Sequence, residues 1–289
     1  MIELDASWRS DHPIEAVEAG TDKDARGRLL VAGGSVNVPG AIALTGEAAL
    51  RVGAGKIRMA TVRSAALLLG VRFPEARVLA LPEDADGEIA DGSPELLLKA
   101  LGGVDVAVIG PGITEQESAA SLVRRVATAD AQIPIILDAA AVACLHGMED
   151  ALEPLRGRLI MTPHSGEMAA LLGCDEEDVR RDQPRYAGDA ARRFGAVIVL
   201  KDAQTVVASP DGGLVHYRGG GPGLGTGGSG DVLVGAIGGL VARGLPLSDA
   251  ASWGVWLHGE AGRTLAAQTA PIGFLARELL PLLPGLLPR

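Results

Sequence analysis

The stretch GPGLGTGGSGDVLVGAIGGLVARG, residues 221–244, runs from a glycine-rich loop directly into an apolar segment with helical spacing. The small residues at 227–230 allow several backbone N–H groups to converge on one anion. A helix that begins near Ser229 adds its positive N-terminal end at the same point. The stretch therefore predicts an anion-binding loop at the start of a buried helix.

Asp231 lies in the first turn of this expected helix. A carboxylate there can act as a base or can simply stabilise the first turn, and its position alone favours neither. No GKS or GKT follows the glycines, so the stretch is not a P-loop, and it does not match GxGxxG after the first strand.

Outside this stretch, short apolar runs alternate with longer helical segments, which is typical of a mostly parallel sheet. The runs are apolar throughout, as expected for strands covered by helices on both faces. The predicted strands are 29–33, 57–62, 76–81, 104–110, 133–138, 158–162 and 196–201. Residues 204–219 predict an antiparallel hairpin around Asp211-Gly212-Gly213, and the later helices are expected at 229–243, 248–264 and 273–282. The fold class is α/β.

Length and composition favour one compact domain over residues 1–289: 47% of the residues are apolar and 21% are charged. A net charge of -10 argues against nucleic acid or an anionic membrane as the main partner. Cys144 and Cys174 show no metal-binding spacing. A charged N-terminus and no apolar stretch longer than about 232–242 predict a cytoplasmic protein.

Polar residues follow several predicted strands. Asp138, residues 162–167, the GPG at 110–112 and Lys201 each stand at a strand's carboxyl end. In doubly wound sheets the ligand crevice lies beyond those ends. One shared crevice is therefore expected.

The segment GTGGSGDVLVGAIGGL resembles the anion-hole and catalytic-aspartate motif of the ribokinase-like superfamily. More narrowly, the chain is similar to the NAD(P)H-hydrate dehydratase family over nearly its whole length. The matching segments, in order, are 27–61, VIGPGI, ILDAAAV, MTPHSGEMAALLG, VLKDAQTVVASPDG, the GGSGD loop and AASWGVWLHGEAG.

The resemblance implies a lyase that repairs nicotinamide cofactors. ADP, or ATP, would phosphorylate the hydroxyl of the S form of hydrated NADH or NADPH; phosphate is then eliminated, which regenerates the cofactor and releases AMP or ADP. It also implies Mg²⁺, a homotetramer and a separate epimerase that interconverts the R and S forms, because no fused epimerase domain is expected here.

Carried over by resemblance, Asp231 is the general base, and the N–H groups of Gly228, Ser229 and Gly230 form the anion hole. Nucleotide contacts fall on Gly230 and on the KDAQT segment, which comprises Lys201, Asp202, Ala203, Gln204 and Thr205. Considered without the resemblance, Lys201 is better explained as a solvated lysine at a strand end.

The same resemblance assigns substrate contacts to Ala41, Gly112, His164 and Asp231. Glu167 would help to organise magnesium and phosphate. The structural alternative is that residues 162–167 only begin a helix, with Ser165 or Thr162 as its cap. As isolated residues, Ala41 and Gly112 would be ordinary packing and turn positions.

Two departures from the family pattern stand out. The family's Asp-Ala-Asp-Ala-Leu is DAAAV here, so a second acid is missing at Ala140, and Asp138 remains a possible polar contact. Asp202 replaces a usual glycine and adds negative charge near a phosphorylated donor.

His258, within an apolar helical pattern, is interpreted as a packing residue and left out of the site.

Two other functions remain open from the sequence. One is a small-molecule kinase of the same superfamily, acting on a hydroxyethylthiazole or hydroxymethylpyrimidine type of alcohol. The other is a non-catalytic nucleotide-binding regulator. The VPGAIAL and TPHSGE segments favour the dehydratase, while the choices between ADP and ATP and between the two hydrates stay open.

Overall fold

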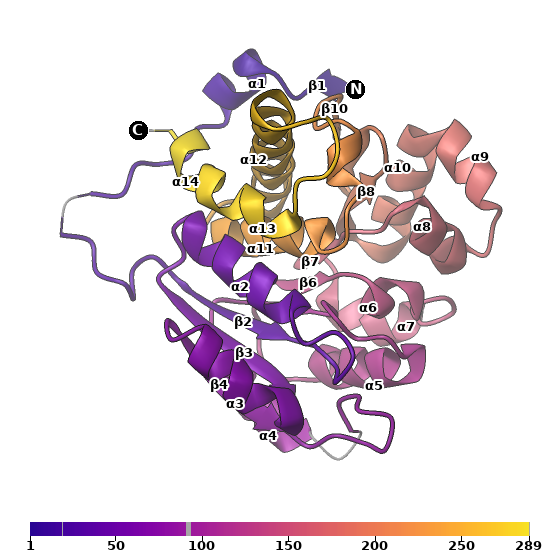
Figure 1. The fold of residues 1–289 in the computed structure, drawn as a ribbon. Helices are drawn as coiled ribbons and strands as arrows, with labels where there is room; N and C mark the ends of the chain where they lie inside the picture. The colour runs from indigo at the N-terminus through magenta and orange to yellow at the C-terminus, as the bar shows by residue number, and fades with distance from the viewer. Residues whose placement is uncertain (19, 91–93, 289) are drawn as a thin grey trace.

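The computed structural model describes residues 1–18, 20–90 and 94–288. Within these ranges the strands are β1 Ile2–Glu3, β2 Arg28–Ala32, β3 Lys56–Val62, β4 Ala76–Leu81, β5 Val106–Ile109, β6 Ile135–Leu137, β7 Leu159–Met161, β8 Ala196–Lys201, β9 Thr205–Ala208 and β10 Leu214–Tyr217. They form one ten-stranded sheet in the order β1-β10-β9-β8-β7-β6-β5-β2-β3-β4 (Figure 1).

The sheet is mostly parallel, as predicted. Strand β9 runs antiparallel to both β8 and β10, which confirms the expected hairpin, and all other neighbouring strands pair in parallel. Strand β1 was not predicted: its two residues pair with Val215 and His216 at the sheet edge. Each of the seven predicted parallel-sheet segments overlaps a strand of the structure, with ends that differ by at most two residues.

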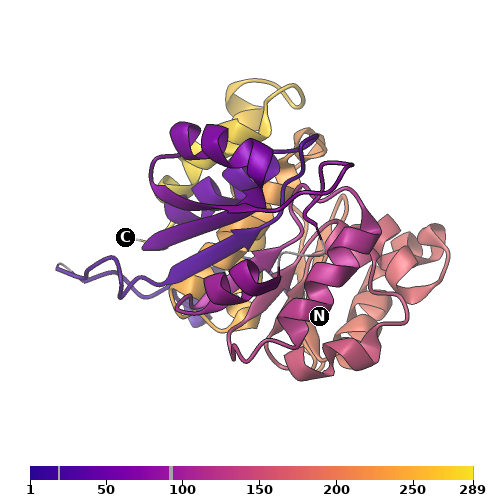
Figure 2. The same ribbon diagram turned by 90° about the horizontal axis from the view of Figure 1, so that it is seen from below.

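The helices cover both faces of the sheet (Figure 2). They are α1 Ala6–Asp11, α2 Ala41–Arg51, α3 Arg63–Arg72, α4 Pro94–Leu101, α5 Gln116–Ala127, α6 Ala140–Ala143, α7 Glu149–Leu152, α8 Ser165–Leu172, α9 Glu176–Arg181, α10 Gln183–Phe194, α11 Ser229–Ala242, α12 Leu247–Gln268, α13 Ala276–Leu279 and α14 Leu283–Leu286. Short 3₁₀ turns are η1 Glu153–Leu155, η2 Pro222–Leu224 and η3 Leu280–Leu282.

Alternate residues of each inner strand enter two separate cores. Leu29 and Val31 of β2 pack in the cluster that includes α2, α11 and α12. Leu30 and Ala32 pack in the cluster that includes α5, α8 and α10. Since side chains alternate between the faces of a sheet, a strand with both faces covered must be apolar at every position.

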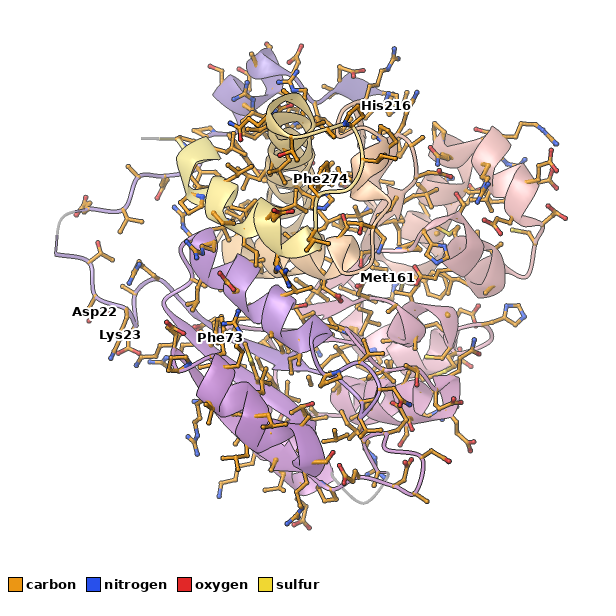
Figure 3. The ribbon with its side chains drawn as sticks, in the orientation of Figure 1. Asp22, Lys23, Phe73, Met161, His216 and Phe274 are labelled. Atoms are coloured by element: carbon orange, nitrogen blue, oxygen red, sulfur yellow. The ribbon has the colours of Figure 1, made fainter. Side chains whose placement is uncertain are left out.

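One predicted helix is wrong in extent. Residues 273–282 were expected to be continuous, but α13 ends at Leu279 and is followed by η3 and α14. Pro281 and Pro284 stand at the starts of those last two turns, and proline removes the N–H that a longer helix needs. Phe274 lies just before α13 (Figure 3). Its ring is buried against the loop that contains Gly223.

Glycines allow α11 to lie directly on α2. A Cβ added at Gly235 would lie 2.2 Å from the Thr45 carbonyl oxygen, and one at Gly239 would lie 2.6 Å from that of Ala49. This close packing fixes the N-terminus of α11 relative to the sheet. Among the described helices, none is long and apolar enough to cross a membrane.

Candidate active site

A buried ion pair lies beyond the carboxyl ends of three adjacent strands. Lys201 Nζ, at the end of β8, donates to Asp138 Oδ1, just after β6, at 2.8 Å. Thr162 Oγ1, after β7, donates to the same oxygen at 2.5 Å. The three strand ends predicted from the sequence to meet at one crevice therefore hold side chains in direct contact.

The charge of Lys201 is balanced by carboxylates around it. Burial by itself lowers the pKa of Lys201. The carboxylates of Asp138, Glu167 and Asp231 outweigh burial and raise the pKa above its ordinary value. The side chain is therefore an ammonium ion and is not the solvated strand-end lysine that its isolated position suggested.

Asp231 occupies the first turn of α11, as predicted. Burial raises the pKa of its carboxyl group to about 7, the charge of Asp138 adds to that effect, and the Lys201 ammonium opposes it. A base whose pKa lies near the operating pH is well matched to proton abstraction. This perturbed carboxyl group is more than a helix-stabilising charge.

The glycine loop places free amides beside Asp231. Gly228 caps α11 with a φ of 88°, and a Cβ there would lie 2.7 Å from Leu44 Cδ1. Across the described ranges, the amide N–H groups of Gly228, Gly230 and Asp231 donate no hydrogen bond. The Ser229 amide, which was also predicted to belong to the anion hole, donates to Thr226 O at 3.2 Å. A Cβ added at Gly230 would lie 3.6 Å from Lys201 Nζ. Unpaired amides and an ammonium ion thus favour an anion here.

A cavity of about 590 Å³ opens beside this loop. Of the residues predicted to contact the nucleotide, it is lined by Lys201, Asp202, Ala203, Thr205 and Gly230. Gln204 is not part of the lining; its carbonyl instead accepts from the Asp202 amide at 3.1 Å. Arg180 and Tyr217 also line the cavity, and nothing in their local sequence marked them.

Asp202, the departure from the family's usual glycine, is engaged within the protein. Its Oδ2 accepts from Ser165 Oγ at 2.7 Å, and its Oδ1 accepts from the Ala203 amide at 2.8 Å. Arg180 Nε lies 3.8 Å from the same carboxylate. The added negative charge is partly compensated by these donors.

His164 and Glu167 form a reciprocal helix cap. His164 Nδ1 accepts from the amides of Gly166 and Glu167, and Glu167 Oε2 accepts from the His164 amide at 2.8 Å. The structural alternative that named Ser165 or Thr162 as the cap is therefore wrong. Because Nδ1 accepts, the ring proton lies on Nε2. Nε2 lies 3.5 Å from Glu167 Oε1, and the ring lines the cavity.

Ala41 and Gly112 meet on the other side of the loop, beyond β2 and β5. Gly112 has a φ of +74°, and a Cβ there would lie 3.0 Å from Ala41 Cβ and 2.6 Å from Val38 O. Neither residue lines the 590 Å³ cavity. The structure thus brings these two predicted substrate residues together, whereas His164 lines the cavity.

The variant Gly112→Ala is expected to raise the KM for the substrate that the resemblance predicts and to lower stability by about 2 kcal/mol, through backbone strain and overpacking. Gly147→Ala is the matched control, because Gly147 shares a φ of +74° but has open space around it. Steady-state kinetics and thermal melting distinguish the two variants. An unchanged substrate KM in Gly112→Ala would contradict a substrate position here.

His258 belongs to this site, although the sequence suggested only a packing role. Its Nε2 lies 2.9 Å from Ser229 Oγ, and the ring lines the cavity. Burial lowers the pKa of His258 to about 4, so the ring is neutral. Helical periodicity places His258 on a buried face of α12 and gives no sign of its contact with a residue 29 positions earlier.

Comparison with known proteins agrees with this geometry. The sheet topology and the glycine loop ahead of Asp231 define an α/β protein of the ribokinase-like class. Within that class, the chain belongs to the NAD(P)H-hydrate dehydratase family, whose model matches residues 29–284.

Three relatives illustrate the match. The ADP-dependent (S)-NAD(P)H-hydrate dehydratase of Xanthomonas campestris pv. campestris is 46% identical over 270 residues, or 93% of this chain and 91% of that protein. A bifunctional NAD(P)H-hydrate repair enzyme Nnr from Moorella thermoacetica is 39% identical over 98% of this chain but 53% of its own length. The ADP/ATP-dependent NAD(P)H-hydrate dehydratase of Bacillus subtilis, co-crystallized with ATP/Mg²⁺, superposes with a TM-score of 0.76 at 31% identity, covering 94% and 92% of the two chains.

Proposed function

We infer that this chain dehydrates the S form of NADH or NADPH hydrate with ADP or ATP as phosphoryl donor, and so regenerates the reduced cofactor. The observation that carries this conclusion is the pairing of Asp231, whose pKa is about 7, with the unpaired amides at the start of α11. A proton acceptor and an anion site then face the same reacting hydroxyl.

The proposed chemistry runs in two steps. The oxygen of the substrate hydroxyl attacks the terminal phosphorus of the donor, and Asp231 accepts the hydroxyl proton. AMP or ADP leaves. The amides of Gly228 and Gly230, together with the Asp231 amide in place of the engaged Ser229 amide, and the Lys201 ammonium stabilise charge on the transferred phosphoryl group. The electrons of the ring nitrogen then expel phosphate, which is a far better leaving group than hydroxide, and a proton is lost.

The nucleotide would occupy the cavity beside the loop. Lys201, Thr205 and Gly230 line it next to the α11 N-terminus, where the donor phosphates must end. Arg180 lines the same cavity and supplies a second cation. Ala41, Gly112 and His164 remain predicted substrate contacts.

We propose that Mg²⁺ reaches the site bound to the nucleotide. In the described part of the chain, no group of three His, Cys, Asp or Glu side chains is arranged to hold a metal ion. Mg²⁺ commonly keeps water and phosphate ligands and uses few carboxylates, so Glu167 and Asp138 are sufficient as outer ligands. The ion would neutralise phosphate charge.

Product analysis distinguishes this function from the kinase alternative. A dehydratase releases AMP, or ADP, and inorganic phosphate in equal amounts with regenerated cofactor. A kinase of the hydroxyethylthiazole or hydroxymethylpyrimidine type would form a stable phosphorylated alcohol and no free phosphate. A non-catalytic regulator would bind nucleotide and release neither.

Assembly and location remain predictions. We propose a homo-oligomer, with a tetramer as the expected form, because Leu67, Leu68 and Val71 give α3 a strongly exposed apolar face. We also propose that a separate epimerase supplies the S form, as the family resemblance implies. A cytoplasmic location fits this cofactor chemistry.

The pH dependence of kcat is expected to follow Asp231. Its carboxyl group, with a pKa of about 7, must be ionised to accept a proton, so kcat should rise with pH through about 7 and fall about tenfold per unit below it. Steady-state rates between pH 5.5 and 8.5 at saturating substrates measure this. A rate that is flat across that range would contradict the assignment of Asp231 as the base.

A further inference from the structure

The Ser229 hydroxyl group lies beside the anion site that the proposed function requires, and the inference about it rests on that function. Its backbone amide donates to Thr226 O at 3.2 Å, so that amide is already engaged. The Ser229 side chain is buried and lines the cavity next to Gly230. The direction of the hydroxyl proton therefore decides whether Ser229 attracts or repels a phosphoryl oxygen.

His258 is in direct contact with this hydroxyl group. Its Nε2 lies 2.9 Å from Ser229 Oγ. One turn earlier on α12, a Cβ added at Gly254 would lie 3.2 Å from the Ile237 backbone nitrogen of α11. The two helices thus pack with their backbones close together, which fixes the distance between the ring and the hydroxyl.

The ring has two possible tautomers with opposite effects. The low pKa of His258 keeps the ring neutral, so one nitrogen carries a proton and the other accepts. If Nε2 accepts, Ser229 gives its proton to the ring and turns only lone pairs toward the loop. If Nε2 donates, the Ser229 proton is free to point into the cavity.

We propose that His258 is a positioning residue that donates from Nε2 to Ser229 Oγ and directs the Ser229 hydroxyl proton toward the transferred phosphoryl group. Only this arrangement adds the Ser229 hydroxyl as a donor beside the unpaired amides of Gly230 and Asp231. The proton would bind more tightly as negative charge develops on the phosphoryl oxygens, so the effect falls on kcat more than on nucleotide binding.

Three substitutions at His258 separate positioning from packing. The amide nitrogen of His258→Gln reaches the place of Nε2, whereas that of His258→Asn stops near Nδ1, and His258→Leu offers no donor. We expect kcat within about 3-fold of wild type for Gln and about 10-fold lower for Asn and Leu, with the KM for ADP changed less than about 3-fold. A purely structural role would lower melting temperatures without this order in kcat.

A double-mutant cycle tests whether His258 acts through Ser229. Ser229→Ala is expected to lower kcat about 10²-fold, and adding His258→Leu to it should cost less than a further 2-fold. The proposal would be overturned if the losses of kcat in Ser229→Ala and His258→Leu multiply in the double variant. It would also be overturned if His258→Gln is no more active than His258→Asn.

Histidine nitrogen NMR of the wild-type protein with ADP and Mg²⁺ tests the tautomer without any turnover. A proton on Nε2 of His258, assigned by its loss in His258→Gln, is expected, and a proton on Nδ1 would overturn the proposal. If no hydrate is converted but Nε2 is protonated, the proposed function fails while the hydrogen bond stands.

Discussion

Replacing Asp231 with asparagine is expected to lower kcat by about 10³-fold, because the amide cannot accept the proton of the attacking hydroxyl. The substitution keeps the size of the side chain and leaves the Gly230 and Asp231 amides in place. ADP affinity, measured by calorimetry, should therefore change less than about 3-fold. Single-turnover and steady-state rates compare the variant with wild type. Equal loss of turnover and of ADP binding would contradict a role as base.

The same variant should gain stability at neutral and higher pH. Because the folded-state pKa of Asp231, about 7, lies above its ordinary value of 3.8, wild type loses stability as pH rises between those values. Asparagine avoids this loss. At about 1.4 kcal/mol for each unit of pKa difference, the loss reaches about 4 kcal/mol at pH 8. Urea unfolding of both proteins at pH 8 and pH 4 measures this difference in stability. If the variant's gain over wild type does not shrink at pH 4, the gain does not come from the raised pKa of Asp231.

Replacing Lys201 with methionine is expected to destabilise the fold by about 3 kcal/mol, because Asp138 stays buried without its cation. The ammonium also lowers the pKa of Asp231, so the pH profile should move to higher pH. The KM for ADP should rise, since Lys201 lines the cavity. Chemical unfolding and pH-dependent kinetics measure these changes.

Two further variants control for this result. In Lys201→Met combined with Asp138→Asn, position 138 no longer carries a buried charge without its cation, so part of the stability should return. Lys56→Met removes an exposed ion pair with Asp24 and should cost less than about 1 kcal/mol. A Lys201→Met protein as stable as Lys56→Met would show that the buried pair contributes little.

The sheet was predictable because local composition carries its signal. Strands such as β5 are apolar at every position since each face is covered, and that pattern needs no knowledge of distant residues. The glycine loop was equally clear, because an anion site built from backbone amides requires small residues in sequence. Strand β1 gave no signal because only two residues pair.

Contacts between distant residues could not be predicted. Lys201 and Asp138 are 63 positions apart, so the sequence showed two polar strand ends but not their ion pair. His258 was missed for the same reason.

The cap of α8 was predicted at the right place with the wrong residue. An imidazole nitrogen accepts the hydrogen bonds from the backbone amides that a serine or threonine oxygen usually accepts.

The most direct test is recovery of reduced-nicotinamide absorbance from chemically hydrated NADH and NADPH with Mg²⁺ and either ADP or ATP. Wild-type protein should restore the absorbance only when a nucleotide is present, with one AMP or ADP and one phosphate released per cofactor. Asp231→Asn should restore almost none at the same protein concentration. No recovery by folded wild-type protein with either nucleotide would contradict the dehydratase function.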